Sequence, residues 1–184
     1  MKSARRYSMS RRAEEQLATR RRIVEAALEL HSTLGPARTP LSAVAERAGV
    51  QRHTLYAHFP EAADLFKACG AHFWETHPFP DVERWAAWDA GELRLRRALT
   101  EVYRYYGENT ATIERVIRDM KLVPVGGGLR TQLARGAEIL AQGWDIDRAG
   151  LRLALYFHTW EALAELGPAR AARLMARMVA ASRR

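Results

Sequence analysis

The sequence predicts an all-α protein of about nine helices. Apolar residues recur at intervals of three and four along most of the chain, which is the period of a helix with one buried face. The strict alternation of apolar and polar residues that marks a half-buried strand is missing. Glycine and proline divide the periodic stretches at "GPARTP", "THPFPD" and "VPVGGG". Of the 184 residues, 48% are apolar and 27% charged, so the chain can fill a globular core.

The first elements are a basic arm and one helix. Residues 1–18 carry several arginines and no long apolar stretch, so we expect a flexible arm rather than a signal peptide. A helix over residues 19–34 is predicted because five apolar residues share one face. They are Ile23, Ala26, Ala27, Leu30 and Leu34.

Two short helices follow, over residues 41–48 and 51–59. The first turns Val44, Ala45 and Ala48 inward together with Leu41. Gly49 then allows the positive φ that commonly ends a helix. The second helix would be anchored by two apolar residues four apart on one side, Leu55 and Phe59. Two short helices joined by a tight turn with a glycine predict a helix-turn-helix.

The remaining two-thirds of the chain predicts longer helices rich in aromatic residues. Their expected ranges are 61–76, 92–106, 110–122, 129–142, 147–166 and 168–184. The stretch 147–166 is apolar nearly all round, which is typical of a helix buried on more than one side. No apolar run approaches the roughly 20 residues that a membrane-spanning helix requires, and we expect a cytoplasmic protein without membrane contact.

The sequence does not predict a metal site or a catalytic site. His53 and His58 are five residues apart and would point about 140° away from each other on a helix. Metal-binding histidines on one helix face are three or four apart. The sequence also has a single cysteine, Cys69, and none of the nucleophile-elbow, zinc-protease or phosphate-loop motifs. We therefore expect no catalytic residue, no metal and no cofactor.

The charge distribution points to a polyanionic partner instead. Eleven basic residues face five acidic ones in residues 1–60, a net charge of +6 out of +8 for the whole chain. The second short helix presents donors, an aromatic ring and a small apolar residue on the side opposite Leu55 and Phe59. Such a face suits phosphates and base edges. A solvated basic tail remains the alternative interpretation of the charge alone.

A resemblance to a known family covers residues 19–71. "TPLSAVAERAGVQRHTLYAHFPEAADLF", preceded by "RRRIVEAALELHSTLG", resembles the DNA-binding core of the TetR family of transcriptional regulators. The resemblance implies a DNA-binding domain at residues 19–60 and a helical regulatory and dimerisation domain at residues 61–184. The later part of the chain resembles the family only in its helical architecture.

The resemblance also implies which residues contact DNA. Thr54 and Tyr56 match backbone-contacting positions, His58 lies within reach of phosphate, and Arg52 is the candidate for reading guanine. The full predicted set is Thr39, Gln51, Arg52, His53, Thr54, Tyr56 and His58.

The sequence departs from the family's pattern at several positions. Gln51 stands where the family usually has the better N-caps Ser or Thr. His53 stands where glycine or proline is frequent, and Ala62 where a phosphate-contacting lysine is common. A phosphate contact is therefore expected to be lost at Ala62. The basic arm, with Arg5, Arg6, Arg11 and Arg12, offers a compensating contact with the duplex.

The same resemblance implies a dimeric repressor released from a palindromic operator by a small-molecule effector. The predicted dimer contact is the C-terminal helices. The predicted effector contacts are the polar-tipped residues Tyr103, Tyr106, Arg118 and His158. The alternative is a helical small-molecule carrier or enzyme that keeps the DNA-binding part as a structural domain.

Overall fold

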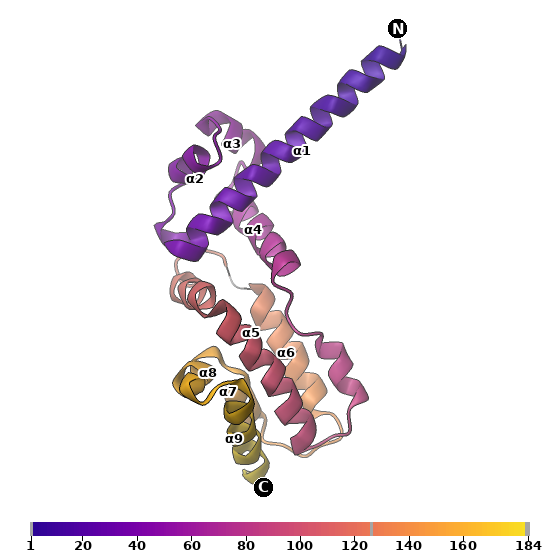
Figure 1. Cartoon of the computed structure of the whole chain (residues 1–184), viewed down its shortest axis with the longest axis vertical. Helices are drawn as coiled ribbons and strands as arrows, with labels where there is room; N and C mark the ends of the chain where they lie inside the picture. The colour runs from indigo at the N-terminus through magenta and orange to yellow at the C-terminus, as the bar shows by residue number, and fades with distance from the viewer. Residues whose placement is uncertain (1, 126, 183–184) are drawn as a thin grey trace. The chain divides into compact units, whose positions relative to one another are not determined.

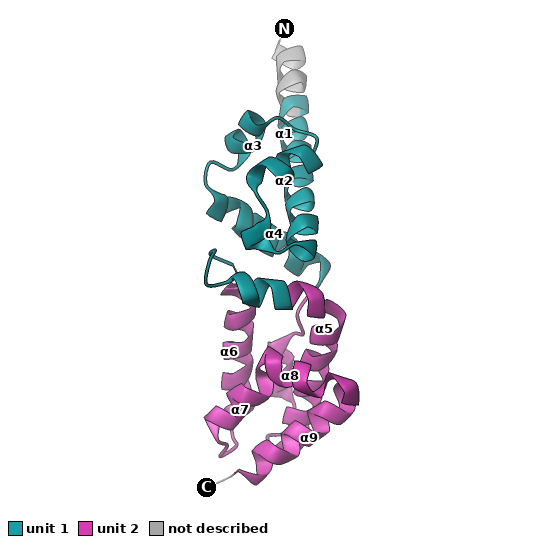
Figure 2. Cartoon of the chain, turned by 90° about the vertical axis from the view of Figure 1, so that its left-hand side faces the viewer, with its two compact units in different colours: residues 1–77, 114–126 teal, residues 78–113, 127–184 magenta. Residues whose placement is uncertain are grey.

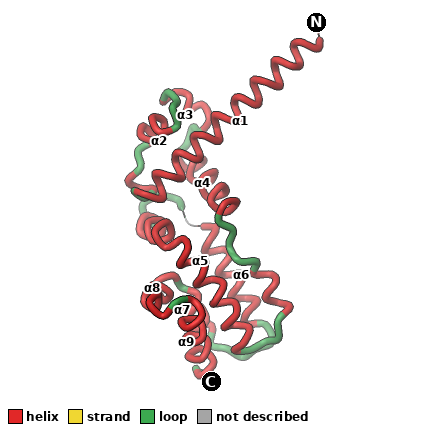
Figure 3. The backbone as a smooth tube through the Cα atoms, viewed as in Figure 1, coloured by secondary structure: helices red, strands yellow, loops and turns green. Residues whose placement is uncertain are grey.

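The computed structural model describes residues 2–125 and 127–182, with side chains from Arg11 onward. These residues form nine α-helices and three 3₁₀ helices and no strand, which confirms the all-α class (Figures 1 and 3). The chain divides into two compact units, coloured separately in Figure 2. Unit 1 holds residues 1–77 and 114–126, and unit 2 holds residues 78–113 and 127–184. Across the described residues, every helix is too short or too polar to cross a bilayer.

Unit 1 is built from four helices, one 3₁₀ helix and the last six residues of α5. The four helices and the 3₁₀ helix are α1 (Lys2–Thr33), η1 (Pro36–Arg38), α2 (Leu41–Arg47), α3 (Arg52–His58) and α4 (Ala62–Thr76). α4 thus belongs with the helix-turn-helix, although the sequence assigned residues from 61 onward to the second domain.

α1 begins at Lys2, well before residue 19, where the sequence predicts the first helix. The first 34 residues contain neither glycine nor proline, so nothing in them interrupts a helix. Arg11 and Glu15 add an ion pair of 3.4 Å across one turn. The segment expected as a flexible arm is therefore a helical continuation of α1. The side chains of Arg5 and Arg6 lie outside the described ones.

The turn between α2 and α3 is set by Gly49, as predicted. Gly49 has a φ of 64° and follows the last residue of the helix cap, Ala48. The Gly49 N–H donates to the Glu46 carbonyl at 3.1 Å, and the Val50 N–H donates to the Ala45 carbonyl at 2.9 Å. This bond pair is the Schellman motif, which satisfies the free carbonyls at a helix end.

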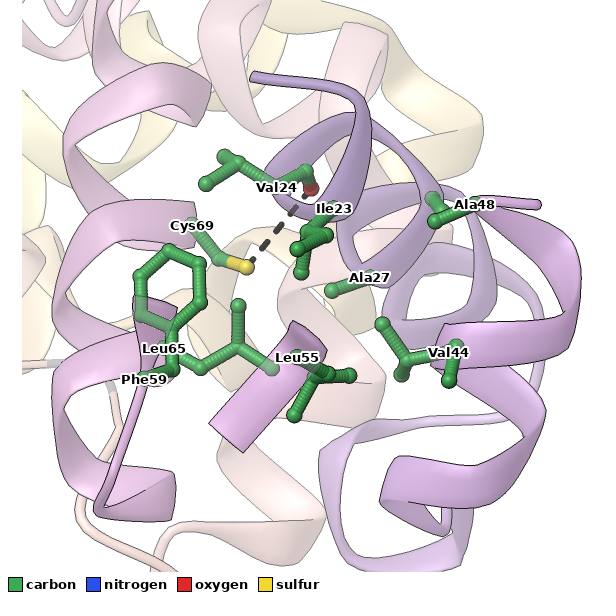
Figure 4. Packing of buried hydrophobic residues seen from close by; sticks show 11 residues of the cluster. Ile23, Val24, Ala27, Val44, Ala48, Leu55, Phe59, Leu65 and Cys69 are labelled. Carbon is green, nitrogen blue, oxygen red and sulfur yellow. Dashed lines mark hydrogen bonds between the residues drawn. The ribbon is translucent and has the colours of Figure 1, made fainter. Parts of the chain in front are cut away.

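The core of unit 1 is small and mostly aliphatic (Figure 4). It combines the inner faces of the four helices, and Cys69 Sγ lies 3.7 Å from the Val24 carbonyl oxygen. Its buried members are Ile23, Val24, Ala26, Ala27, Val44, Ala45, Ala48, Leu55, Phe59, Leu65 and Cys69. The predicted inward faces are thus confirmed except at Leu34, which is exposed beyond the end of α1.

The described residues of unit 2 form one long helix and six shorter ones, two of which are 3₁₀ helices. They are η2 (Val82–Ala87), most of α5 (Glu92–Asp119), α6 (Gly127–Ala141), α7 (Arg148–Leu155), α8 (Phe157–Leu163), η3 (Ala164–Leu166) and α9 (Pro168–Ala181).

α5 runs without a break, so the prediction of separate helices over 92–106 and 110–122 is wrong. Polar residues where the two expected ranges meet bond to the backbone of α5. Asn109 Nδ2 donates to the Tyr105 carbonyl at 2.9 Å, and Thr110 Oγ1 donates to the Tyr106 carbonyl at 2.7 Å. Gly107 leaves room for the Trp160 ring, because a Cβ there would lie 3.2 Å from Trp160 Cζ2.

The predicted single helix over 147–166 is also wrong, because the chain leaves the helical conformation at Tyr156. Tyr156 has a φ of −75° and a ψ of 138° and separates α7 from α8. The Thr159 hydroxyl donates to the Leu153 carbonyl at 2.6 Å across this break. Carbonyls left free at the end of α7 are therefore satisfied by side chains.

Aromatic residues fill the core of unit 2. Trp85, Tyr103 and Tyr106 are fully buried, and Phe157 and Trp160 are nearly so. Trp85 lies against Gly136 of α6, where a Cβ would lie 2.6 Å from Trp85 Cζ3. This close approach explains why α6 carries a glycine in its interior.

Candidate nucleic-acid interface

α3 has one buried side and one exposed side. Leu55 and Phe59 are each only 1% exposed. Arg52, His53 and Tyr56 lie on the exposed side, with Tyr56 43% exposed. A side with this many donors and no covering element in unit 1 is free to meet a partner.

The buried side fixes α3 firmly to α1. The Arg20 guanidinium carbon lies 4.1 Å from the centre of the Phe59 ring, a cation–π contact. Nine residues after Arg20 on α1, Glu29 accepts a hydrogen bond of 2.5 Å from Arg47 of α2. α2 and α3 are therefore held as a pair on one scaffold helix, which is what reading a groove requires.

The remaining predicted DNA contacts lie around this exposed side with differing freedom. Thr54 and His58 are half-buried at its flanks, and Ala57 adds a small exposed residue. Gln51 is the N-cap of α3, but its side chain makes no cap hydrogen bond and is exposed. The Gln51 amide is thus left for a partner.

Thr39 differs from the other predicted contacts. It is buried, and its Oγ1 donates to the Gly35 carbonyl at 2.8 Å. Its hydroxyl proton is therefore committed within unit 1. Among the side chains that the structure describes, from Arg11 onward, no three metal-ligating groups lie together.

Two predicted effector contacts lie together in the core of unit 2. Tyr103 and Tyr106 have ring centres 6.5 Å apart. Their hydroxyls donate to the carbonyls of Ala154 and Leu155, each at 2.7 Å. Burial raises the pKa of both phenols above the usual value, so both remain protonated donors.

The other two predicted effector contacts are elsewhere. His158 is exposed on α8 and lies 2.9 Å from Glu161 through its Nδ1. Arg118 belongs to unit 1, where it pairs with Asp119 at 2.7 Å. The structure therefore does not bring the four residues to one place.

Sequence reasoning missed Asp119. This carboxylate is 2% exposed and accepts a hydrogen bond of 3.0 Å from the Ala37 N–H. The two residues are 82 positions apart, and no local motif links them. Only the glycine and proline of "LGPAR" signal that the backbone there is unusual.

Comparison with known proteins finds relatives of the helix-turn-helix part of the chain. Residues 23–69 match the family of bacterial regulatory proteins, tetR family. The HTH-type transcriptional regulator TtgR of Pseudomonas putida is 43% identical over 67 residues, which cover 36% of this chain and 32% of TtgR. The chain thus matches about a third of the length of this relative.

Solved structures extend the likeness of fold to most of the chain. A provisionally named fatty acid metabolism regulator from Clostridium perfringens superposes with a TM-score of 0.58 at 16% identity. That match covers 86% of this chain and 94% of the other. RolR in complex with resorcinol superposes with a TM-score of 0.51 at 18% identity, covering 91% and 90%. Residues 23–69 are thus similar in sequence to the tetR family of bacterial regulatory proteins, and the rest of the chain is similar to the solved structures in fold alone.

Proposed function

We propose that this chain is a dimeric DNA-binding transcriptional repressor whose operator affinity is lowered by a small-molecule effector. The exposed side of α3 carries the proposal, because it presents Arg52, His53 and Tyr56 from a helix anchored by Leu55 and Phe59. The match of residues 23–69 to a family of regulatory proteins supports the same function.

The contacts divide by what they recognise. Arg52, at the first position of α3, is the proposed base reader, since a guanidinium pairs with guanine O6 and N7. Thr54, Tyr56 and His58 are the proposed phosphate contacts, which position the helix without reading sequence. His53 adds a projecting ring beside Arg52 and makes the preferred operator specific to this chain.

The test is footprinting on the DNA that flanks the chain's own gene, followed by binding measurements over a range of salt. Arg52→Ala should relax sequence preference by about 1–3 kcal/mol at one base position. Tyr56→Phe and Thr54→Ala should weaken binding to all duplexes alike. Arg104→Ala is the matched control, because Arg104 is exposed on α5 in unit 2. An Arg52→Ala protein with unchanged preference would refute the base-reading role.

A second copy of the chain is proposed to cover apolar side chains that are exposed on α7 and α9 of unit 2, and these residues are here called the apolar patch. Leu174 and Met178 lie four apart on α9 and are 41% and 57% exposed, and Leu153 on α7 is 58% exposed. A two-fold dimer would place two copies of α3 on successive major grooves, about 34 Å apart. Exposed apolar side chains on packed helices are typical of such contacts.

Sedimentation measures this assembly directly. Leu174→Glu should convert a dimer to a monomer, because it places a charge in the apolar patch. Arg173→Ala, one residue earlier and exposed, should leave the dimer intact. A wild-type protein that sediments as a monomer at micromolar concentration contradicts the dimer.

The effector is proposed to bind in unit 2, against the aromatic core around Tyr103 and Tyr106. The two phenol oxygens are polar groups inside an apolar environment, which is the usual character of a small-molecule site. The bound resorcinol of RolR supports an effector of small size for a body of this fold. An effector can release DNA only by favouring one conformation over another.

A further inference from the structure

A carboxylate from the last turn of α5 caps the 3₁₀ helix that precedes the helix-turn-helix. The Ala37 N–H of η1 donates to Asp119 Oδ2 at 3.0 Å. The Arg118 guanidinium donates to both oxygens of the same carboxylate, from Nε to Oδ1 at 2.7 Å and from Nη2 to Oδ2 at 3.1 Å. Arg118 Nη2 also donates to the Leu34 carbonyl at 3.0 Å. We name these contacts of Arg118 and Asp119 with Leu34 and Ala37 the α5 latch.

The backbone at Gly35 is shaped to receive the latch. Gly35 has a φ of 96°, a conformation that residues with a side chain rarely adopt. A Cβ at this position would overlap both Arg118 Nη2 and Asp119 Oδ2. Glycine is therefore required here both by conformation and by the space that the latch occupies.

The electrostatics favour a charged latch. Hydrogen bonds from Arg118, followed by the Ala37 N–H, hold the pKa of the Asp119 carboxyl below its usual value. Asp119 is thus ionised at neutral pH, and its charge lies at the N-terminal end of η1, where free N–H groups favour an anion.

The α5 latch joins the segment that leads into α2 to a helix that also contributes to the core of unit 2. On one side, η1 leads through Thr39 and Pro40 directly into α2. On the other side, the same helix that carries Asp119 contributes Tyr103 and Tyr106 to the core of unit 2. The same helix therefore carries both the buried phenols of unit 2 and the carboxylate that caps η1.

We propose that Arg118 and Asp119 are positioning residues that couple the state of unit 2 to α2 and α3. An engaged latch holds η1 and the start of α2 in the DNA-binding geometry. A released latch loosens them and lowers operator affinity. This inference rests on the proposed function, since it names the residues by which a body-bound effector acts on the DNA-binding helices.

Two measurements on the full-length protein test the proposal. Hydrogen exchange follows the amides of residues 36–47, and fluorescence anisotropy follows binding to the footprinted duplex. Asp119→Ala removes both the cap and the ion pair, and should speed exchange and weaken operator binding by about tenfold or more. Asp119→Asn keeps an acceptor for the Ala37 N–H, so its exchange rates and operator affinity should lie between those of wild type and Asp119→Ala. Glu108→Gln makes the same charge change at an exposed site on α5 and should match wild type.

A double-mutant cycle separates coupling from simple stabilisation. Tyr106→Phe alters only unit 2, yet it should speed exchange at residues 36–47 when the latch is intact. In the Asp119→Ala background it should add nothing there. Equal increments in both backgrounds, or wild-type exchange in Asp119→Ala, would overturn the inference. A wild-type protein that binds no duplex would instead refute the proposed function, while the exchange measurements still judge the latch.

Discussion

Unit 1 and unit 2 are stabilised by different kinds of contact. In unit 1, Leu55, Val44 and their aliphatic neighbours pack between short helices that follow one another in sequence. In unit 2, the buried phenols of Tyr103 and Tyr106 reach helix-end carbonyls 51 and 49 residues away. The difference shows that local spacing specifies the short helices of unit 1, whereas long-range polar bonds inside an aromatic core specify the fold of unit 2.

Leu55→Ala is the change with the largest expected effect, because it empties the centre of the aliphatic core. Removing a buried leucine side chain costs about 2–5 kcal/mol, so the free energy of unfolding of unit 1 should fall by about 3 kcal/mol. Denaturation followed by circular dichroism measures the loss. Four of the five tryptophans lie in unit 2, so their emission should change little if the units are stabilised separately.

Leu17→Ala is the matched control for that change. Leu17 lies on the same scaffold helix α1 and is 67% exposed, so its truncation should stay within about 0.5 kcal/mol of wild type. Equal losses for the two variants would contradict the claim that the small core stabilises unit 1.

The same contrast explains what the sequence could and could not predict. The sequence predicts the buried positions of Leu55 and Phe59 and the helix-ending role of Gly49, because helix period and helix-end chemistry act over a few residues. The continuity of α5 and the break at Tyr156 were mispredicted. α5 continues because the side chains of Asn109 and Thr110 donate to carbonyls of its own backbone. At the break after α7, a freed carbonyl is satisfied by the Tyr106 hydroxyl, which is distant in sequence.

The candidate site divides in the same way. The exposed side of α3 follows from the spacing of its two anchors, so Arg52, His53 and Tyr56 could be placed from the sequence. Thr39 could not, because its burial depends on the loop around Gly35. The roles of Arg118 and Asp119 depend on a contact across 82 residues, which no single sequence displays.

His31 should make unit 1, and not unit 2, sensitive to mild acid. Burial lowers the pKa of His31 from 6.5 to about 4, although the nearby Asp119 charge opposes the shift. The unfolded chain therefore binds this proton first, and stability is lost as pH falls from about 6.5 towards 4. Between pH 7 and pH 5 the expected loss is about 2 kcal/mol.

Chemical denaturation at the two pH values, with wild type and His31→Leu, measures this effect. The carboxylates contribute similarly to both proteins, so the difference in slope isolates His31. His31→Leu should lose less stability than wild type on acidification. In wild type the His31 ring lies 5.4 Å from the Phe66 ring between centres, and the leucine side chain should largely replace this contact by apolar packing. Parallel pH profiles would show that His31 is not held neutral by burial.

Tyr106→Phe has the smallest expected effect and tests the polar half of the comparison. It leaves the aromatic ring in place but removes the donor to the Leu155 carbonyl. An unpaired buried carbonyl costs about 1–3 kcal/mol, so unit 2 should lose roughly 1–2 kcal/mol in denaturation followed by tryptophan emission. Tyr156→Phe is the control, because Tyr156 is 51% exposed at the helix break itself. If both variants behave alike, packing alone holds α7 and α8 apart. If only Tyr106→Phe is destabilised, the hydrogen bond from the Tyr106 hydroxyl on α5 to the last residue of α7 stabilises unit 2, and the polar half of the comparison holds.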